Sequence, residues 1–387
     1  MLRKAIALFT VFFIILFCTG CWNNRDLTEM AISTGIGIDK TDDGRFMVST
    51  QIVKPSAAKI SSNEGKNGGS QKSFVVVSST ADTVFGAIRG MLSRVNEKIF
   101  YSSSQAIVIG ENAARSGISD FLDFLQRDHE TQYKTHVLVT KDITAKEILE
   151  QEYVLSNIPG AFIADTIENT SARAFLKPTM LIELVKELSS METQVVLGTI
   201  YMKDNTTDTE GAAVFLKDKM VGWLNRFETR GYMFIAEKIK STILEIPNPE
   251  APDKMIGIEL ISSSSKISLE HGTNGRVAFS VVIKPRGNIG EQNEDGSLEQ
   301  PEFIEKLVGN FNREVENEVL GVIKKCQKEY KSDIFGFGSV LHKKNPGYWQ
   351  KMKDDWNEKG FANASIRIKV DSELLRTGLV KEPVVAR

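Results

Sequence analysis

Hydrophobic and polar residues alternate along many short stretches of the chain, and this alternation predicts β-strands. In RFMVSTQIVKP, for example, Phe46, Val48 and Ile52 fall on one side, and the pattern ends at Pro55. Comparable runs read SFVVVSST, SQAIVIG, THVLVT, VVLGTIYM, GAAVFLK, KMVGWL, MIGIELI, SKISLE, GRVAFSVVIKP and ASIRIKVDSEL. The chain is therefore expected to be rich in short strands.

Between these strands, apolar residues recur every three or four positions, which predicts amphipathic helices. The clearest helix covers Glu302–Tyr330, where the recurring residues are Ile304, Leu307, Phe311, Val315, Val319, Val322 and Cys326. At 1.5 Å per residue this helix extends about 43 Å. Shorter helices are predicted near residues 87–95, 118–125, 145–151, 159–172 and 178–190.

Turns of hairpin length between strands favour antiparallel pairing, with helices packed on the sheets. We therefore expect an α+β fold of two or three domains, each a mostly antiparallel or mixed β-sheet surrounded by helices. An N-terminal α+β region, divisible into two subdomains, is expected over residues 21–195, and a C-terminal α+β region over 196–387. Three prolines in Ile246–Lys254 predict a joint there.

The first 20 residues have the layout of a secretory signal. Arg3 and Lys4 precede an apolar run, Ala5–Cys18, which is too short to cross a bilayer core that needs about 20 helical residues. Thr19 and Gly20 lead into Cys21, an ending that resembles a bacterial lipobox, although Cys18 stands where leucine is usual. Removal of residues 1–20 would leave Cys21 at the N-terminus as an S-diacylglycerol cysteine, with or without N-acylation.

The Cys18–Cys21 spacing also suits a redox motif or half of a zinc site. No thioredoxin-like unit surrounds the pair, and the four histidines are scattered along the sequence, so lipidation is the preferred interpretation. Because two acyl chains suffice for stable anchoring, the processed protein would be held at the outer face of a membrane. The third cysteine, Cys326, lies on the apolar stripe of the long helix and is expected to pack in the core.

Composition excludes several classes of protein. The 387 residues are 41% hydrophobic and 25% charged, which is typical of a folded globular protein, and the formal net charge is −2. A nearly neutral chain does not suit a nucleic-acid binder or attachment to anionic lipid by charge alone.

Motifs that carry chemistry are scarce. The segment EQNEDGSLEQPE places Glu291, Asn293, Asp295 and Glu302 at ligand positions of a calcium loop, but a strand precedes it where a helix is expected. We prefer a solvated loop that caps the long helix, and we expect no catalytic residues and no cofactor. In GIGIDK, Gly35 and Gly37 are better explained by close approach of a neighbouring element than by nucleotide binding.

A segment rich in glycine and aromatic residues, Lys331–Trp356, admits two interpretations. Exposed aromatic residues would form a docking surface. The preferred alternative is that Phe335, Phe337, Trp349 and Trp356 close the core where the long helix turns back.

Five segments together resemble the Ger(x)C family, the C-subunit lipoproteins of bacterial nutrient germinant receptors. These are GCWNNRDLTEMAISTGIGIDK, VSTQIVKP, GAAVFLKDKMVGWLNRFETRGY, DIFGFG with NPGYWQKMKDDW, and IRIKV with LLRTG, in consistent order from Gly20 to Gly378. The first is the most specific, and Asn23 departs from the usual aspartate.

The resemblance implies a non-enzymatic subunit on the outer face of the spore inner membrane. It would act with the A and B membrane subunits of the receptor in sensing nutrients and triggering germination, through protein–protein contact. Two alternatives remain open: a solute-binding lipoprotein that captures a nutrient for a transporter, for which two similar lobes around a cleft are expected, and a cell-envelope hydrolase.

Overall fold

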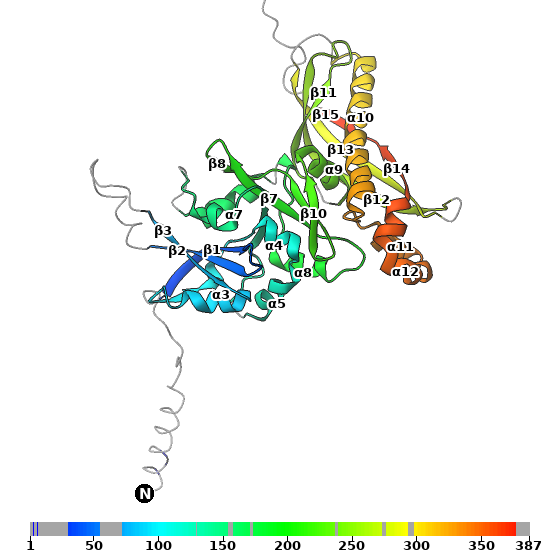
Figure 1. The fold of residues 1–387 in the computed structure, drawn as a ribbon. Helices are drawn as coiled ribbons and strands as arrows, with labels where there is room; N and C mark the ends of the chain where they lie inside the picture. Colours follow the sequence, from blue (N-terminus) through cyan, green and yellow to red (C-terminus); the bar gives the residue numbers. More distant parts are fainter. Residues whose placement is uncertain are drawn as a thin grey trace, which may run out of the picture.

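The protein consists of two halves, each built around its own β-sheet (Figure 1). The computed structural model describes residues 3, 6 and 30–376, with gaps at 55–71, 129, 154–157, 171–172, 237–238, 273–275 and 293–297. Helices and strands are both abundant, so the predicted α+β class is confirmed. Within these residues no helix is at once apolar enough and long enough to pass through a bilayer.

The first sheet has ten strands, with a main order of β10-β9-β7-β6-β5-β1-β2-β3, while β4 pairs with β1 and β8 with β7. The strands are β1 (Met30–Lys40), β2 (Phe46–Val53), β3 (Phe74–Ala81), β4 (Lys98–Phe100), β5 (Ala106–Ile109), β6 (His136–Thr140), β7 (Val196–Lys203), β8 (Thr206–Asp208), β9 (Ala212–Leu216) and β10 (Lys219–Leu224). The central neighbours β1, β5, β6 and β7 are parallel, whereas the outer pairs are antiparallel. The sheet is therefore mixed.

Helices cover both faces of this sheet because the central strands are apolar on both sides. In β5, Ile107 and Ile109 belong to a core with α3 (Val84–Met91), α4 (Glu111–Ser116), α5 (Ser119–Arg127) and α8 (Leu181–Leu188). Ala106 and Val108 face α6 (Ala145–Glu150) and α7 (Pro159–Thr170) on the other side. Continuous apolar runs of this kind are typical of parallel strands buried on both faces.

The second sheet has five strands, in the order β11-β12-β13-β14, with β15 also paired to β13. They are β11 (Thr242–Pro247), β12 (Met255–Glu270), β13 (Ala278–Gln292), β14 (Ser365–Val370) and β15 (Glu373–Arg376). Pro247 pairs with Met255, so the proline-rich segment Ile246–Lys254 turns the chain from β11 into β12 within one sheet. The prolines end one strand and favour a turn, and the joint expected there remains a prediction about domains.

The long helix α10 (Pro301–Lys325) lies along the second sheet and continues as a π-helical turn, Cys326–Tyr330. This matches the helix predicted over 302–330. Its buried stripe starts at Phe303, whereas Ile304 is only half-buried, because Phe303, Leu307 and Phe311 follow one another at intervals of four. Cys326 is fully buried, which confirms its predicted role in packing.

The remaining short helices close the second half beyond α10. They are α11 (Phe337–Lys344), α12 (Pro346–Met352), the 3-10 turns Lys353–Asp355 and Phe361–Asn363, and the π turn Trp356–Gly360. Phe335, Phe337, Trp349 and Trp356 are all buried, so the preferred interpretation of this aromatic segment as core is confirmed.

The two halves share one core through α9 (Arg226–Ala236). Val196 and Val214 of the first sheet belong to the same buried cluster as Tyr232 of α9 and Val322 of α10. Strands β7 to β10 follow residue 195 but belong to the first sheet, and the chain passes to the second sheet only after α9. The division at residues 195/196 remains a prediction about domains and does not coincide with the boundary between the sheets.

Candidate functional site

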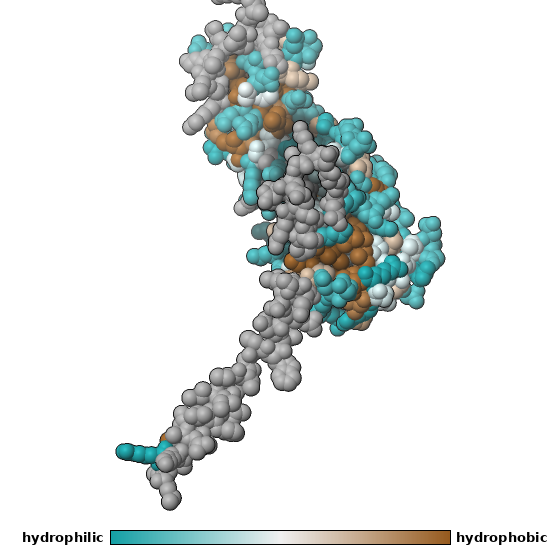
Figure 2. All heavy atoms as spheres, turned by 90° about the vertical axis from the view of Figure 1, so that its left-hand side faces the viewer, coloured by the Kyte–Doolittle hydropathy of each residue, from teal (hydrophilic) through white to brown (hydrophobic). Residues whose placement is uncertain are grey.

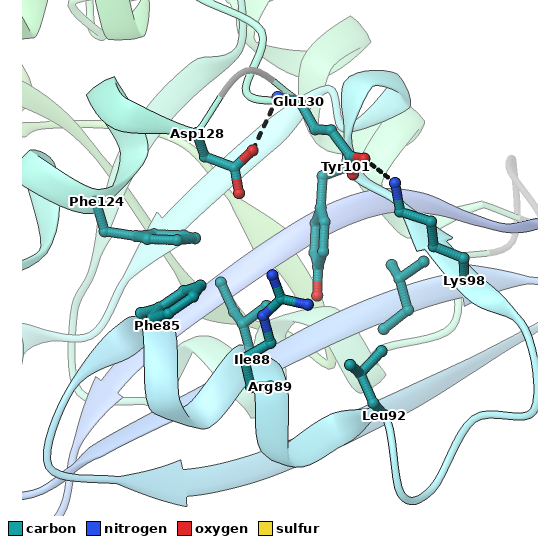
Figure 3. Close-up of a pocket in the computed structure, with 10 residues that line it drawn as sticks. Phe85, Ile88, Arg89, Leu92, Lys98, Tyr101, Phe124, Asp128 and Glu130 are labelled. Carbon is teal, nitrogen blue, oxygen red and sulfur yellow. Dashed lines mark hydrogen bonds and ion pairs between the residues drawn. The ribbon is translucent and has the colours of Figure 1, made fainter. Parts of the chain in front are cut away.

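A groove opens between α3, α5 and β4 on the first half of the molecule (Figure 3). We call it the α3 groove; its cavity has a volume of about 310 Å³ and is lined by Phe85, Ile88, Arg89, Leu92, Lys98, Ile99, Tyr101, Phe124, Asp128 and Glu130. This volume lies at the small end of the range found for ligand pockets.

The position of α3 explains the apolar wall of the α3 groove. The Thr83 hydroxyl accepts a hydrogen bond from the Gly86 amide at 3.0 Å and caps the helix. Val84, Ala87 and Met91 are buried against the sheet, yet Phe85 and Leu92 on the outer side are 49% and 45% exposed. Helix α3 is thus apolar on both faces, which is unusual for a surface helix.

Of the two cationic side chains in the α3 groove, Lys98 has an anionic partner and Arg89 has none among the described residues. Lys98 forms an ion pair with Glu130, whose amide donates to the Asp128 carboxylate at 2.9 Å (Figure 3). The Arg89 guanidinium lies 5.1 Å from the centre of the Phe85 ring. The Arg89 guanidinium forms no ion pair or hydrogen bond with a described residue, so it is available to an anion.

Tyr101 and Phe124 complete the wall. The Phe85 and Phe124 rings lie 5.5 Å apart and tilted. Burial raises the pKa of Tyr101 to about 12, so its hydroxyl is neutral at physiological pH. Six of the ten lining residues are aromatic or aliphatic and four are charged, so the groove combines apolar side chains with ionic ones.

A second cluster surrounds Asp333, which sequence reasoning did not single out. Its carboxylate accepts hydrogen bonds from the amides of Phe335, Gly336, Phe337 and Gly338 at 2.7–3.3 Å, and from the Trp356 indole at 2.8 Å. Burial raises the pKa of Asp333 to about 6, although these donors oppose the rise. The cluster fixes the start of α11 and orients Trp356.

The Asp333 cluster also connects the halves. The Gln194 amide donates to the Asp333 carbonyl at 2.9 Å, and the Ser332 hydroxyl donates to the Phe215 carbonyl at 2.6 Å. His342 of α11 lies 2.6 Å from the Glu192 carboxylate. These contacts join α11 to segments beside the first sheet, so the cluster has a structural role.

The glycines of GIGIDK allow a helix to approach, as predicted. A Cβ atom at Gly35 would lie 2.9 Å from a methyl carbon of Leu149, and one at Gly37 would lie 3.2 Å from the Ala145 Cβ. The Asp39 carboxylate accepts hydrogen bonds from the Ala145 and Lys146 amides at 2.8 and 3.0 Å. Asp39 therefore holds the N-terminus of α6 against β1.

The remaining predicted site residues are only partly described. Cys21 lies outside the described residues, as do Asn293 and Asp295 of the calcium-loop candidate. Glu291 lies near the end of β13 and Glu302 in the first turn of α10. Throughout the described part of the chain, no three His, Cys, Asp or Glu side chains gather closely enough to hold a metal ion.

Two family models match the chain in succession. The model described as "Spore germination protein N-terminal domain" matches residues 23–201, and "Spore germination B3/ GerAC like, C-terminal" matches residues 210–378. Together they cover both halves.

Whole-chain comparisons agree with these matches. Spore germination protein KC of Bacillus subtilis (strain 168) is 25% identical and covers 99% of this chain and 98% of its own length. Spore germination protein B3 of the same organism is 21% identical over 98% of this chain and all of its own. The crystal structure of the GerBC protein shares the fold with a TM-score of 0.53 and 16% identity, covering 88% of this chain and 97% of that chain.

Proposed function

Because this chain belongs to the Ger(x)C family of spore germination proteins, we propose that it is the lipid-anchored C subunit of a nutrient germinant receptor. The diacylglyceryl group on Cys21 would hold it on the outer face of the spore inner membrane. There it would contact the A and B membrane subunits and take part in sensing nutrients and triggering germination. We assign it no catalytic step.

One observation carries this proposal: a signal layout that ends at Cys21 directly precedes two matched family regions, which cover residues 23–201 and 210–378. The arrangement suits a body that works beside a membrane. The shared core also favours a rigid body with a fixed relation between its halves. The solute-capture alternative expects two similar lobes, whereas the first sheet has ten strands and the second has five in another order.

Processing at Cys21 gives the first prediction. Mass spectrometry of the protein from spore membranes should show a chain that begins at Cys21 and carries a diacylglyceryl group. Cys21→Ala should abolish this modification, shift the protein out of the membrane fraction and impair the germination response. Each acyl chain contributes about 0.8 kcal/mol of membrane affinity per buried methylene, so its loss is decisive.

Cys18→Ala is the matched control, since Cys18 would be removed with the signal and its replacement should leave the mature mass unchanged. An intact leader, or a mature N-terminus at another residue, would contradict the anchoring proposal. A normal germination response with Cys21→Ala would show that anchoring is not required for function.

A further inference from the structure

The α3 groove lies where the described body begins. Met30, the first residue of β1, pairs with Lys98 of β4, and Lys98 lines the groove. Helix α3 lies on the lower side of the half that contains the first sheet, away from the second sheet (Figure 1). The segment between Cys21 and Met30 therefore joins the body beside this groove.

The length of that segment limits how far the α3 groove can lie from an anchor at Cys21. Met30 follows Cys21 by nine positions in the sequence. A fully extended chain spans at most ~3.6 Å per residue, so the reach is about 30 Å. A bilayer that holds the lipid of Cys21 is thus close enough to touch the groove.

The surface around the α3 groove is unusually apolar for an exposed helix. Phe85 and Leu92 project from α3, and Val75 is exposed on β3, the edge strand against which α3 packs. Figure 2 shows one face of the molecule, on which hydrophobic side chains are exposed in patches on both halves. Exposed apolar patches of this kind mark interaction sites.

Cationic groups lie among these apolar side chains. Arg89 extends over the Phe85 ring without an anionic partner among the described residues. Arg94, just beyond α3, donates to the Ser78 carbonyl at 2.6 Å. Arginine beside aromatic and aliphatic residues suits the boundary between lipid headgroups and acyl chains, where the apolar body is buried and the charge meets phosphate.

We propose that the α3 groove is a membrane-contact surface that seats the first half of the protein on the phospholipid bilayer. This inference rests on the proposed anchoring at Cys21. Phe85 and Leu92 enter the headgroup region, and the Arg89 guanidinium binds a lipid phosphate. Because Lys98 is already paired with Glu130, burial of apolar surface contributes more to the contact than charge does.

A spin label at residue 92 tests the contact. The full, processed chain with Leu92→Cys would be labelled with a nitroxide and reconstituted in vesicles of phosphatidylglycerol and phosphatidylethanolamine. Cys326 should not compete for the label, because it is fully buried and burial raises the pKa of its thiol. Collision of the label with oxygen, which concentrates in lipid, is compared with collision with a water-soluble nickel complex.

The matched control is a label at Leu320 on α10, which is similarly exposed but belongs to the second half. We expect the ratio of oxygen to nickel collisions to be several-fold higher at residue 92 than at residue 320. Phe85→Asp should lower the ratio at residue 92, because a carboxylate does not enter the headgroup boundary. Equal ratios at the two positions, or a label at 92 shielded from both reagents by a protein neighbour, would overturn the membrane contact.

Cosedimentation with the vesicles separates this inference from the anchoring on which it rests. Anchored protein that cosediments while residue 92 stays in water refutes the contact surface and leaves the anchor intact. Protein that fails to cosediment refutes both. Arg89→Ala should reduce the collision ratio at residue 92, whereas Arg115→Ala, which removes an arginine already paired with Glu111, should not change it.

Discussion

Asp333 shows how much of the architecture can depend on one buried residue. Four backbone amides and the Trp356 indole donate to its carboxylate, so one side chain organises the turn that leads into α11. The DIFGFG sequence reveals its aromatic and glycine residues but not the burial of its aspartate. That burial depends on Trp356, which is 23 residues away, and on Gln194 from the other half of the chain.

The raised pKa of Asp333 predicts a specific dependence of stability on pH. Its ordinary value is 3.8 and its folded value is about 6, so the folded state binds the proton more tightly than the unfolded state. The stability that this group contributes is fully present below about pH 4 and is lost as pH rises through 6. As pH rises from about 4 through 6, the free energy of unfolding of the wild type, measured in urea, should therefore fall relative to that of Asp333→Asn.

Asp354→Asn supplies the comparison, because Asp354 is exposed in the neighbouring turn. The free energy of unfolding of Asp354→Asn should change with pH in the same way as that of the wild type. If the free energy of unfolding of Asp333→Asn also changed with pH as that of the wild type does, Asp333 would not titrate in this range.

Among the secondary-structure elements, the crossing of α9 and α10 fixes the relation between the halves. Gly231 packs directly on α10, because a Cβ atom there would lie 2.6 Å from the Glu318 carbonyl oxygen. Beside it, Arg230 and Glu318 form a buried ion pair, and the Arg230 guanidinium also donates to the Ile243 carbonyl at 2.7 Å. Loss of either charge would leave the other buried without a partner.

Gly231→Ala should lower the free energy of unfolding by about 1–3 kcal/mol, since the added methyl group forces the two helices apart. Gly321→Ala is the matched control on α10, because a Cβ atom there meets nothing within 4 Å. Alanine at that exposed helical position should raise stability by up to about 1 kcal/mol. Urea denaturation of the two variants measures both effects, and equal effects would rule out the close packing at Gly231.

The elements also show which parts of the fold the sequence could predict. The long helix was predictable because its period is local, although the predicted stripe began at Ile304 instead of Phe303 and omitted Ile323. The parallel centre of the first sheet was not, since β1 pairs with β5 about 70 residues later. The α3 groove was equally hidden, because its walls come from α3, β4 and α5 and meet only in the folded chain.

For the whole molecule, the shared core around α9 predicts cooperative unfolding. Val196 and Val214 of the first sheet are buried with Val281 of the second and Val322 of α10, so neither half can unfold without exposing core residues of the other. Differential scanning calorimetry should show one transition whose calorimetric and van't Hoff enthalpies agree. Gly231→Ala should shift this single transition to a lower temperature without splitting it. Two separate peaks would contradict the shared core.

The position of β1 has a mechanical consequence. This strand follows the segment that leads from Cys21, yet it lies inside the sheet, with antiparallel β2 on one side and parallel β4 and β5 on the other. A pull on that segment acts along the strand, so it loads the flanking hydrogen-bond ladders in shear, many bonds at once. A tether on an edge strand could be peeled away bond by bond, whereas β1 would resist tension from the proposed anchor at Cys21.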